Sequence, residues 1–344
     1  MSVLARLITL AERAPPPDFV TRAAISAFVA DTARRLARLE PDAEAQFLED
    51  MARLPIALHV AAANTQHYEV PAAFFETVLG ARRKYSCCYY ASPESTLDEA
   101  ETEALKQTVE RAEIRDGMHI LELGCGWGSL SLYMAEKFPN AHILAVSNSN
   151  TQRQTIDALA RRRGLQNLQV VTADMNVFDT VRRFDRIVSV EMFEHMANWR
   201  ALLGRCLSWL TAEGRLFLHV FTHANGAYRF DHADQTNWIA QHFFTGGMMP
   251  SHALPKHFPD LFSVERDWRW SGDHYARTAR DWLARFDDAE SEIETILRPV
   301  YGAQTRLWMT RWRWFFLATE GLFGHAGGSV WGVGHYLMRP SHAG

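Results

Sequence analysis

The stretch Met118-His-Ile-Leu-Glu-Leu-Gly-Cys-Gly-Trp-Gly128 constrains the fold of this chain more than any other. A short apolar run ends at Glu122, and glycines follow at the alternate positions Gly124, Gly126 and Gly128. A segment with helical periodicity begins directly after them. The pattern predicts a strand, a tight turn and a helix N-terminus, and glycines in such a turn let a ligand approach the backbone closely.

From residue 98 onward, predicted helices and strands alternate. The strands are expected at 118–123, 142–147, 168–172, 185–191 and 215–221, and the helices at 98–113, 128–138, 150–163 and 197–210. This alternation is typical of βαβ units, which form a parallel sheet that binds its ligand at the carboxyl ends of the strands. We therefore expect an α/β fold with the glycine turn at its binding edge.

The two ends of the chain show looser patterns. Apolar residues at helical spacing predict mainly helix over 18–60, whereas 64–97 contain a short strand or helix at most. After 222 a polar stretch reaches 250, followed by a strand at 262–268, helices at 276–297 and 303–321, and a strand at 330–338. These patterns predict a helical N-terminal cover at 1–97, a cofactor-binding core at 98–222, and a substrate lid with closing strands at 223–344.

The composition is that of a soluble globular protein, with 47% apolar and 22% charged residues and no apolar run long enough to span a membrane. The N-terminus lacks a signal-peptide pattern. The four cysteines have neither zinc spacing nor the spacing of a disulfide framework. We expect a cytoplasmic protein with reduced thiols and no metal site. The net charge of −4 argues against nonspecific nucleic-acid binding.

The spacing of the glycine turn distinguishes two kinds of nucleotide site. Dinucleotide-binding turns have the spacing G-x-G-x-x-G and place a pyrophosphate at the helix N-terminus. Here the spacing is G-x-G-x-G, and Glu122 lies two residues before the first glycine. A carboxylate there suits a cationic group better than a phosphate. The turn resembles the S-adenosylmethionine (SAM) loop of class I methyltransferases; an ordinary glycine-rich turn is the alternative.

The ends of the second and third predicted strands supply further candidate cofactor contacts. Asp174 can accept a hydrogen bond from an adenine amino group, and Met175 can lie against the ring. An Asp after a strand is otherwise a common turn or cap residue. The second strand has no acidic residue at its end, but Ser147, Asn148 and Gln152 can bind ribose hydroxyls without a charge.

An acidic cluster, Glu191, Glu194 and His195, follows the fourth predicted strand, where the transferred methyl group is expected. Carboxylates there favour a sulfonium and concentrate amines in the pocket. An amine attacks only as its free base, and a His or Glu can take its proton, which contributes about 10²–10⁴ in rate. The cluster therefore suits methyl transfer to an amine.

Several motifs together extend the resemblance beyond the glycine turn. They are His67-Tyr-Glu-Val-Pro71, Tyr85-Ser-Cys-Cys-Tyr-Tyr90, Leu121–Gly128, Ser147-Asn-Ser149 with Gln152, Glu191-Met-Phe-Glu-His-Met196, Phe244-Thr-Gly-Gly-Met-Met-Pro-Ser251 and His274-Tyr-Ala-Arg-Thr278. Over about 65–338 the set resembles the superfamily of cyclopropane-fatty-acid synthases and coclaurine N-methyltransferases. Glu191–Met196, Phe244–Ser251 and the closing Trp331–His335 look closest to the coclaurine N-methyltransferase branch, whose members methylate the nitrogen of benzylisoquinoline-type amines.

The resemblance implies a Rossmann-like methyltransferase fold with a seven-stranded sheet and a lid built from both ends of the chain. It implies SAM as the cofactor, with Tyr85 and Ser86 among its contacts. It also makes Glu194 and His195 the catalytic candidates, with Glu191 in support. Capping of the helix at 197–210 by the Glu-His pair is the alternative role.

The lipid-modifying branch of the superfamily uses the same scaffold differently. It resembles this chain in a bicarbonate site built from a Cys, a Glu, a His and a Tyr, here Cys87, Glu194, His219 and Tyr275. Bicarbonate would be the base that removes a proton from a methylated carbocation. Methyl or methylene transfer to unsaturated phospholipid acyl chains is therefore the second hypothesis.

The leading hypothesis is N-methylation of a small apolar or aromatic amine. The N-terminal segment supports it, because its acidic residues are as numerous as its arginines, whereas basic clusters would help a lipid-modifying enzyme at an anionic membrane. A protein that binds SAM without catalysis is a third hypothesis, and sulfur or carbon acceptors stay open. The expected partner is a small molecule or an acyl chain, not nucleic acid, and a homodimer is one open state of assembly.

Overall fold

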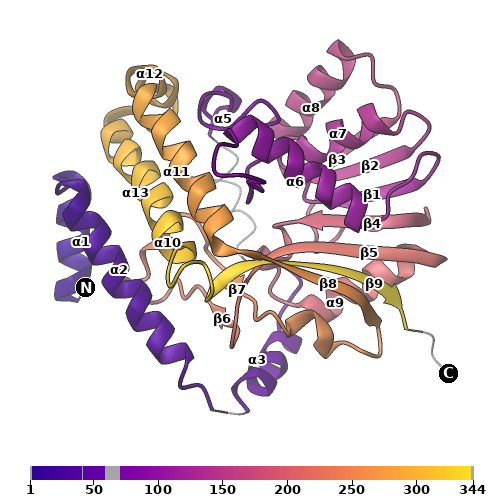
Figure 1. The fold of residues 1–344 in the computed structure, drawn as a ribbon, viewed down its shortest axis with the longest axis horizontal. Helices are drawn as coiled ribbons and strands as arrows, with labels where there is room; N and C mark the ends of the chain where they lie inside the picture. Colours follow the sequence, from indigo (N-terminus) through magenta and orange to yellow (C-terminus); the bar gives the residue numbers. More distant parts are fainter. Residues whose placement is uncertain (1, 41, 59–69, 342–344) are drawn as a thin grey trace.

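A seven-stranded sheet with helices on both faces forms the centre of the protein (Figure 1). The computed structural model describes residues 2–40, 42–58 and 70–341, so His67, Tyr68 and Glu69 of the first motif lie outside the described residues. The strand order is β3-β2-β1-β4-β5-β9-β8. The predicted α/β fold with a seven-stranded methyltransferase sheet is confirmed.

The parallel part of the sheet contains β1 (His119–Leu123), β2 (His142–Ser147), β3 (Leu168–Thr172), β4 (Phe184–Val190) and β5 (Leu210–His223). β1 and β2 consist of nearly continuous apolar runs because helices cover both of their faces. β8 (Phe262–Ser271) and β9 (Trp331–Pro340) add an antiparallel part, with β9 between β5 and β8. All of the predicted strands are present. The carboxyl ends of β1 to β4 meet at one edge of the sheet.

Four helices flank the parallel strands: α6 (Leu97–Arg111), α7 (Ser129–Lys137), α8 (Asn150–Arg162) and α9 (Trp199–Trp209). Side chains fix where they begin. Thr96 and Glu99 form a capping box at the start of α6, and the Ser149 hydroxyl accepts a hydrogen bond from the Gln152 N–H at the start of α8. These local signals explain why the predicted bounds agree with the observed ones to within two residues.

The remaining helices come from residues 3–78 and 238–323. They are α1 (Val3–Arg13), α2 (Asp18–Leu36), α3 (Ala43–Ala52), α5 (Ala72–Val78), α10 (Trp238–His242), α11 (Gly272–Asp288), α12 (Glu290–Tyr301) and α13 (Thr305–Phe323). Short β6 (Tyr228–Arg229) and β7 (Met248–Met249) pair with each other, and the 3-10 turns are η1 (Phe193–His195), η2 (Leu254–His257) and η3 (Gly302–Gln304). None of the helices in the described ranges is long and apolar enough to cross a bilayer.

Two helical predictions differ from the structure. The sequence pattern predicts one helix over 276–297, but the chain leaves helical geometry at Ala289, with φ −109° and ψ 21°, and forms α11 and α12. Helix α1 was not predicted. It precedes the proline run, and most of its apolar side chains are exposed, including Val3, Leu7 and Leu10.

The two ends of the chain lie side by side. In Figure 1 the indigo helices α1 and α2 lie beside the yellow helix α13, and both contact it. Arg313 of α13 donates to both oxygens of Asp18 at 2.5 and 2.8 Å, and Arg311 donates to Glu12 at 2.9 and 3.0 Å. A large aromatic core that includes Trp282, Phe315 and Phe316 packs between these helices and the sheet.

Candidate active site

The glycine turn after β1 has the left-handed backbone that the sequence predicts. Gly124, Gly126 and Gly128 have φ values of +79°, +51° and +84°. A Cβ atom at Gly124 would lie 2.6 Å from the Met192 side chain, whereas one at Gly126 would meet no protein atom within 4 Å. Gly128 is the N-cap residue of α7 and does not line the cavity that the other two border. The turn thus leaves a space in front of Gly126.

A cavity at the carboxyl ends of β1 to β4 collects the predicted cofactor contacts. Among its lining residues are Tyr85, Ser86, Glu122, Gly124, Gly126, Ser147, Asn148, Gln152, Asp174 and Met175. The Ser131 hydroxyl donates to the buried Glu122 carboxylate, and burial raises the pKa of Glu122 to about 7. A cationic ligand nearby would favour its ionised form. The Ser147 hydroxyl donates to Gln152 Oε1 at 2.7 Å, which ties β2 to the first turn of α8.

Two unpartnered donors indicate that this cavity binds a polar ligand. The Trp127 indole N–H and the Ser129 hydroxyl are buried, line the cavity and have no hydrogen-bond partner among the described residues. Buried polar groups are otherwise nearly always hydrogen-bonded. Together with the space at Gly126 and the carboxylates of Glu122 and Asp174, they fit SAM, which has polar ribose and adenine groups and a cationic centre.

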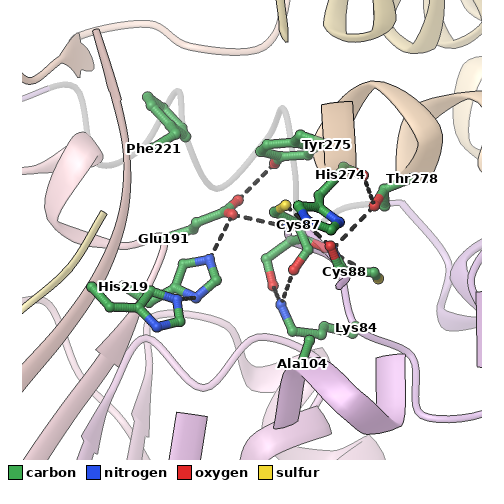
Figure 2. A network of polar contacts seen from close by, with 12 residues as sticks. Lys84, Cys87, Cys88, Ala104, Glu191, His219, Phe221, His274, Tyr275 and Thr278 are labelled. Carbon is green, nitrogen blue, oxygen red and sulfur yellow. Dashed lines mark hydrogen bonds and ion pairs between the residues drawn. The ribbon is translucent and has the colours of Figure 1, made fainter. Parts of the chain in front are cut away.

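Three groups surround the carboxylate of Glu191, directly after β4 (Figure 2). Its Oε1 accepts the backbone N–H of Cys87 at 2.9 Å and lies 3.1 Å from His219 Nε2, while its Oε2 accepts the Tyr275 hydroxyl at 2.6 Å. Glu191 has a φ of +48°, a left-handed conformation that is uncommon outside glycine. Burial raises the pKa of Glu191, and the nearby Lys84 ammonium opposes this rise. Glu191 and Tyr275 both line the cavity.

The other two members of the acidic cluster lie in η1 and differ in exposure. His195 lines the cavity and stacks on Phe244, with ring centroids 4.8 Å apart. Glu194 is completely buried and does not line the cavity; its Oε1 accepts the Phe221 N–H at 2.7 Å. Burial, and then the charge of Glu191, raise the pKa of Glu194 well above its ordinary value. The pKa of Glu194 is thus raised more strongly than that of Glu191.

The alternative capping role of the Glu-His pair does not describe the start of α9. Asn198 is its N-cap residue, and the Asn198 side chain accepts the Ala201 N–H at 3.0 Å. Glu194 and His195 are therefore free of the capping function that their position in the sequence suggested.

The residues expected to form a bicarbonate site meet in a different arrangement. Cys87, His219 and Tyr275 converge, but on the Glu191 carboxylate, and Glu194 is not among their partners. Cys87 takes part through its backbone N–H, while its thiol donates to the Cys88 carbonyl at 3.3 Å. Burial raises the pKa of that thiol well above its ordinary value. A carboxylate of the chain itself therefore lies among these three groups.

Comparison with known proteins decides the family. The sequence model of the family described as mycolic acid cyclopropane synthetase matches residues 58–323. The chain belongs to the mycolic acid cyclopropane synthetase family. The predicted family and the predicted class of enzyme, a SAM-dependent methyltransferase, are confirmed.

The relatives of this chain include two kinds of enzyme, N-methyltransferases and cyclopropane-fatty-acyl-phospholipid synthases. The chain is 36% identical to (S)-coclaurine N-methyltransferase from Thalictrum flavum subsp. glaucum over 83% of this chain and 81% of that protein. It is 30% identical to cyclopropane-fatty-acyl-phospholipid synthase from Escherichia coli K12, over 66% of this chain and 57% of that protein. A crystal structure of coclaurine N-methyltransferase bound to N-methylheliamine and SAH superposes with a TM-score of 0.92 at 32% identity, covering 98% of this chain and 100% of that one.

Lys84, His335 and Arg111 contact residues of the site, but the sequence does not single them out as functional candidates. Lys84 is buried, and its ammonium donates to Ser86 Oγ at 2.5 Å and to the Cys87 carbonyl at 2.6 Å. His335 and Arg111 extend the contacts of His219 away from the cavity. His335 lies in the closing motif that the sequence analysis noted, but only the pairing of β5 with β9 brings it to His219. No local sequence pattern at Arg111 predicts its contact with His335.

Proposed function

We propose that this protein transfers the methyl group of SAM to the nitrogen of a small aromatic or apolar amine. The observation that carries the proposal is the Glu191 carboxylate, fixed by three donors at the wall of the cavity. A buried negative charge there attracts a cationic or N–H-bearing acceptor. The relatives named coclaurine and tetrahydroprotoberberine N-methyltransferase support an amine as the acceptor.

We propose distinct roles for the residues at the acceptor side of the cavity. When bound, SAM supplies an electrophilic methyl group on a sulfonium. Glu191 orients the acceptor by accepting an N–H of the amine, and the His195 imidazole takes the proton that the nitrogen loses. Glu194, which is buried and has a strongly raised pKa, positions the Phe221 backbone and does not touch the acceptor. Precise placement contributes more than proton transfer, because effective molarities reach about 10⁵–10⁸ M, against about 10²–10⁴ for a general base.

Aromatic side chains give the acceptor its apolar surroundings. Phe221, Phe244 and Phe315 line the cavity beside Tyr275. Such rings bury large apolar areas, and their faces attract a cationic nitrogen. An aromatic amine gains more from these walls than a small polar one.

Transfer to an unsaturated acyl chain is the second candidate, supported by the family match and by the lipid-modifying relative. In that chemistry an external bicarbonate would need the donors that Glu191 already occupies. We therefore propose that the activity needs no bicarbonate. A cytoplasmic location and a homodimer stay predictions of the sequence, to be tested by cell fractionation and by light scattering.

One assay tests the proposal. The purified protein is given methyl-labelled SAM with a panel of aromatic amines and with unsaturated phospholipid vesicles, in buffers with and without bicarbonate. We expect label on an amine at the same rate in both buffers. Label in the acyl chains, or a strict requirement for bicarbonate, would overturn the proposal. The Glu191→Gln variant is the control for activity that depends on the cavity.

A further inference from the structure

A line of hydrogen bonds leads from Glu191 through the sheet to the last turn of α6. His219 Nε2 lies 3.1 Å from Glu191 Oε1, and His219 Nδ1 lies 2.9 Å from His335 Nε2. His335 Nδ1 in turn lies 2.9 Å from Nη1 of Arg111. Both imidazoles are completely buried, and Arg111 is half-buried. Neither Arg111 nor His335 lines the cavity.

The donor and the acceptor of every hydrogen bond in this line follow from Arg111, which lies at the end farthest from the cavity. A guanidinium can only donate, so His335 Nδ1 must be the acceptor. The proton of a neutral His335 then lies on Nε2 and is donated to His219 Nδ1. That nitrogen is thereby an acceptor as well, so the His219 proton lies on Nε2 and is donated to Glu191. One arginine thus determines the tautomers of two histidines.

The sheet builds this line from strands that are far apart in the sequence. His219 of β5 and His335 of β9 are directly opposite each other in the antiparallel pair, which places both rings on one face. Trp270 of β8 covers both, with centroids 4.3 Å from His335 and 5.3 Å from His219. Trp270 itself is buried and donates to Gln107 of α6 at 3.1 Å. The line is therefore enclosed by packed side chains.

We propose that Arg111 and His335 are positioning residues that hold His219 as an Nε2–H donor to the Glu191 carboxylate, and so keep that carboxylate charged and oriented for the acceptor. The inference rests on the role proposed for Glu191. With the other tautomer, His219 would present a lone pair to Oε1, and Glu191 would lose one of its three donors. A buried carboxylate with fewer donors takes up a proton more readily.

The charges around the line also favour neutral imidazoles. Burial, followed by the charges of Lys84 and Arg111, lowers the pKa of His219 well below its ordinary value. Burial, His219, Arg111 and Lys84 do the same for the pKa of His335. The other titratable groups that face Glu191 are Cys87, Tyr275, His195 and Glu194. The pKa values of Cys87, Tyr275 and Glu194 are raised well above their ordinary values, so the proposal places the negative charge of this group on Glu191.

Nitrogen NMR of the full-length protein tests the tautomers without any acceptor. We expect two neutral histidines, each with its proton on Nε2, joined by a scalar coupling between nitrogens across the His335–His219 bond. An imidazolium, or a proton on Nδ1 of either ring at pH 7.5, would overturn the proposal. Because this signal needs no turnover, it separates a failure of this inference from a failure of the proposed N-methylation.

Variants of Arg111 test the consequence for catalysis. In Arg111→Met we expect the single tautomer to be lost, kcat at pH 7.5 to fall about tenfold or more, and SAM affinity to stay within about twofold. Because burial still lowers the pKa of both histidines, the pH profile of kcat should acquire a new limb that lies below the ordinary histidine pKa of about 6.5. Arg111→Lys, which keeps a donor, should restore part of the rate.

Arg266→Met is the matched control. Arg266 also lies over the Trp268 ring, 5.4 Å from its centroid against 5.2 Å for Arg111, but it pairs with Glu113 and not with His335. We expect this variant to keep the wild-type pH profile and the wild-type tautomers. An unchanged pH profile and unchanged tautomers in Arg111→Met would remove Arg111 from the proposed role, and the same new limb in Arg266→Met would show that packing alone explains it.

Discussion

At the scale of single residues, the proposed mechanism depends most on the Glu191 carboxylate. Replacing it with Ala should lower kcat at least a hundredfold, because positioning of the acceptor is lost. The donors from Cys87, His219 and Tyr275 stay in place and face an empty space of carboxylate size. Formate or bicarbonate at millimolar concentration should therefore restore part of the activity of Glu191→Ala. The measurement is the initial rate against anion concentration, with chloride as the control.

A different outcome at Glu191 would change the mechanism. If no small anion restores the rate of Glu191→Ala while SAM affinity is normal, the three donors do not form an anion site. Glu191 then acts because its side chain holds the carboxylate at one position in the cavity. Wild-type turnover in this variant would remove Glu191 from the mechanism.

The glycine turn offers a second test at this scale. Gly126 and Gly117 both have positive φ and open space where a Cβ would lie, but only Gly126 lines the cavity. Either Gly→Val change should cost about 1–2 kcal/mol of stability for the left-handed backbone. Only Gly126→Val should also abolish SAM binding by calorimetry. Equal SAM affinity in the two variants would separate the turn from the cofactor site.

At the scale of elements, the buried Glu12 fixes α1 to the lid helices. Burial raises its pKa, but hydrogen bonds from His242, Arg311 and Trp238 outweigh this and lower the pKa to about 2. Since the folded-state pKa lies below the ordinary value of 4.5, Glu12 contributes stability above pH 4.5, and this contribution is lost as the pH falls toward 2. We expect Glu12→Gln to lower the free energy of unfolding by up to about 3 kcal/mol at pH 6 and by much less at pH 3.

Chemical denaturation at the two pH values measures this difference. The control is Asp31→Asn, which breaks the exposed pair with Arg34 and should cost less than about 1 kcal/mol at either pH. A loss in Glu12→Gln that is as large at pH 3 as at pH 6 would mean that packing, and not the charge, holds α1 in place.

The same scale shows which parts of the fold the sequence could predict. The βα units follow from local signals, namely apolar runs of strand length, the left-handed glycines and capping residues such as Ser149. No Gly or Pro marks the break at Ala289, so the helical periodicity of the sequence continues across it and does not predict two helices. The roles of Glu191 and Glu194 were harder to separate. They are three residues apart, and only the left-handed backbone at Glu191 and the 3-10 turn that follows decide which carboxylate faces the cavity.

At the scale of the whole molecule, the insertion of β9 between β5 and β8 determines what lies behind the site. The predicted cofactor contacts come from strand ends that are neighbours in the chain order, so the sequence could predict their convergence as a group. The line from Glu191 to Arg111 joins residues separated by up to 224 positions. Such pairings depend on the antiparallel register of β9. The periodicity of one segment does not predict the register in which two segments pair.

The cavity is lined by the ends of β1 to β3, which form the proposed cofactor side, and by Tyr275 of α11 and Phe315 of α13, which form part of the proposed acceptor side. Helix α1 is attached to α13 through Arg311 and Glu12 and does not contribute to the lining. Deleting residues 2–16 should therefore loosen the acceptor side alone. We expect the KM for the amine to rise about tenfold, while SAM affinity by calorimetry stays within about twofold. An equal loss of both would mean that the two sides of the cavity form one cooperative unit, with the ends of the chain stabilising the sheet edge as well as the lid.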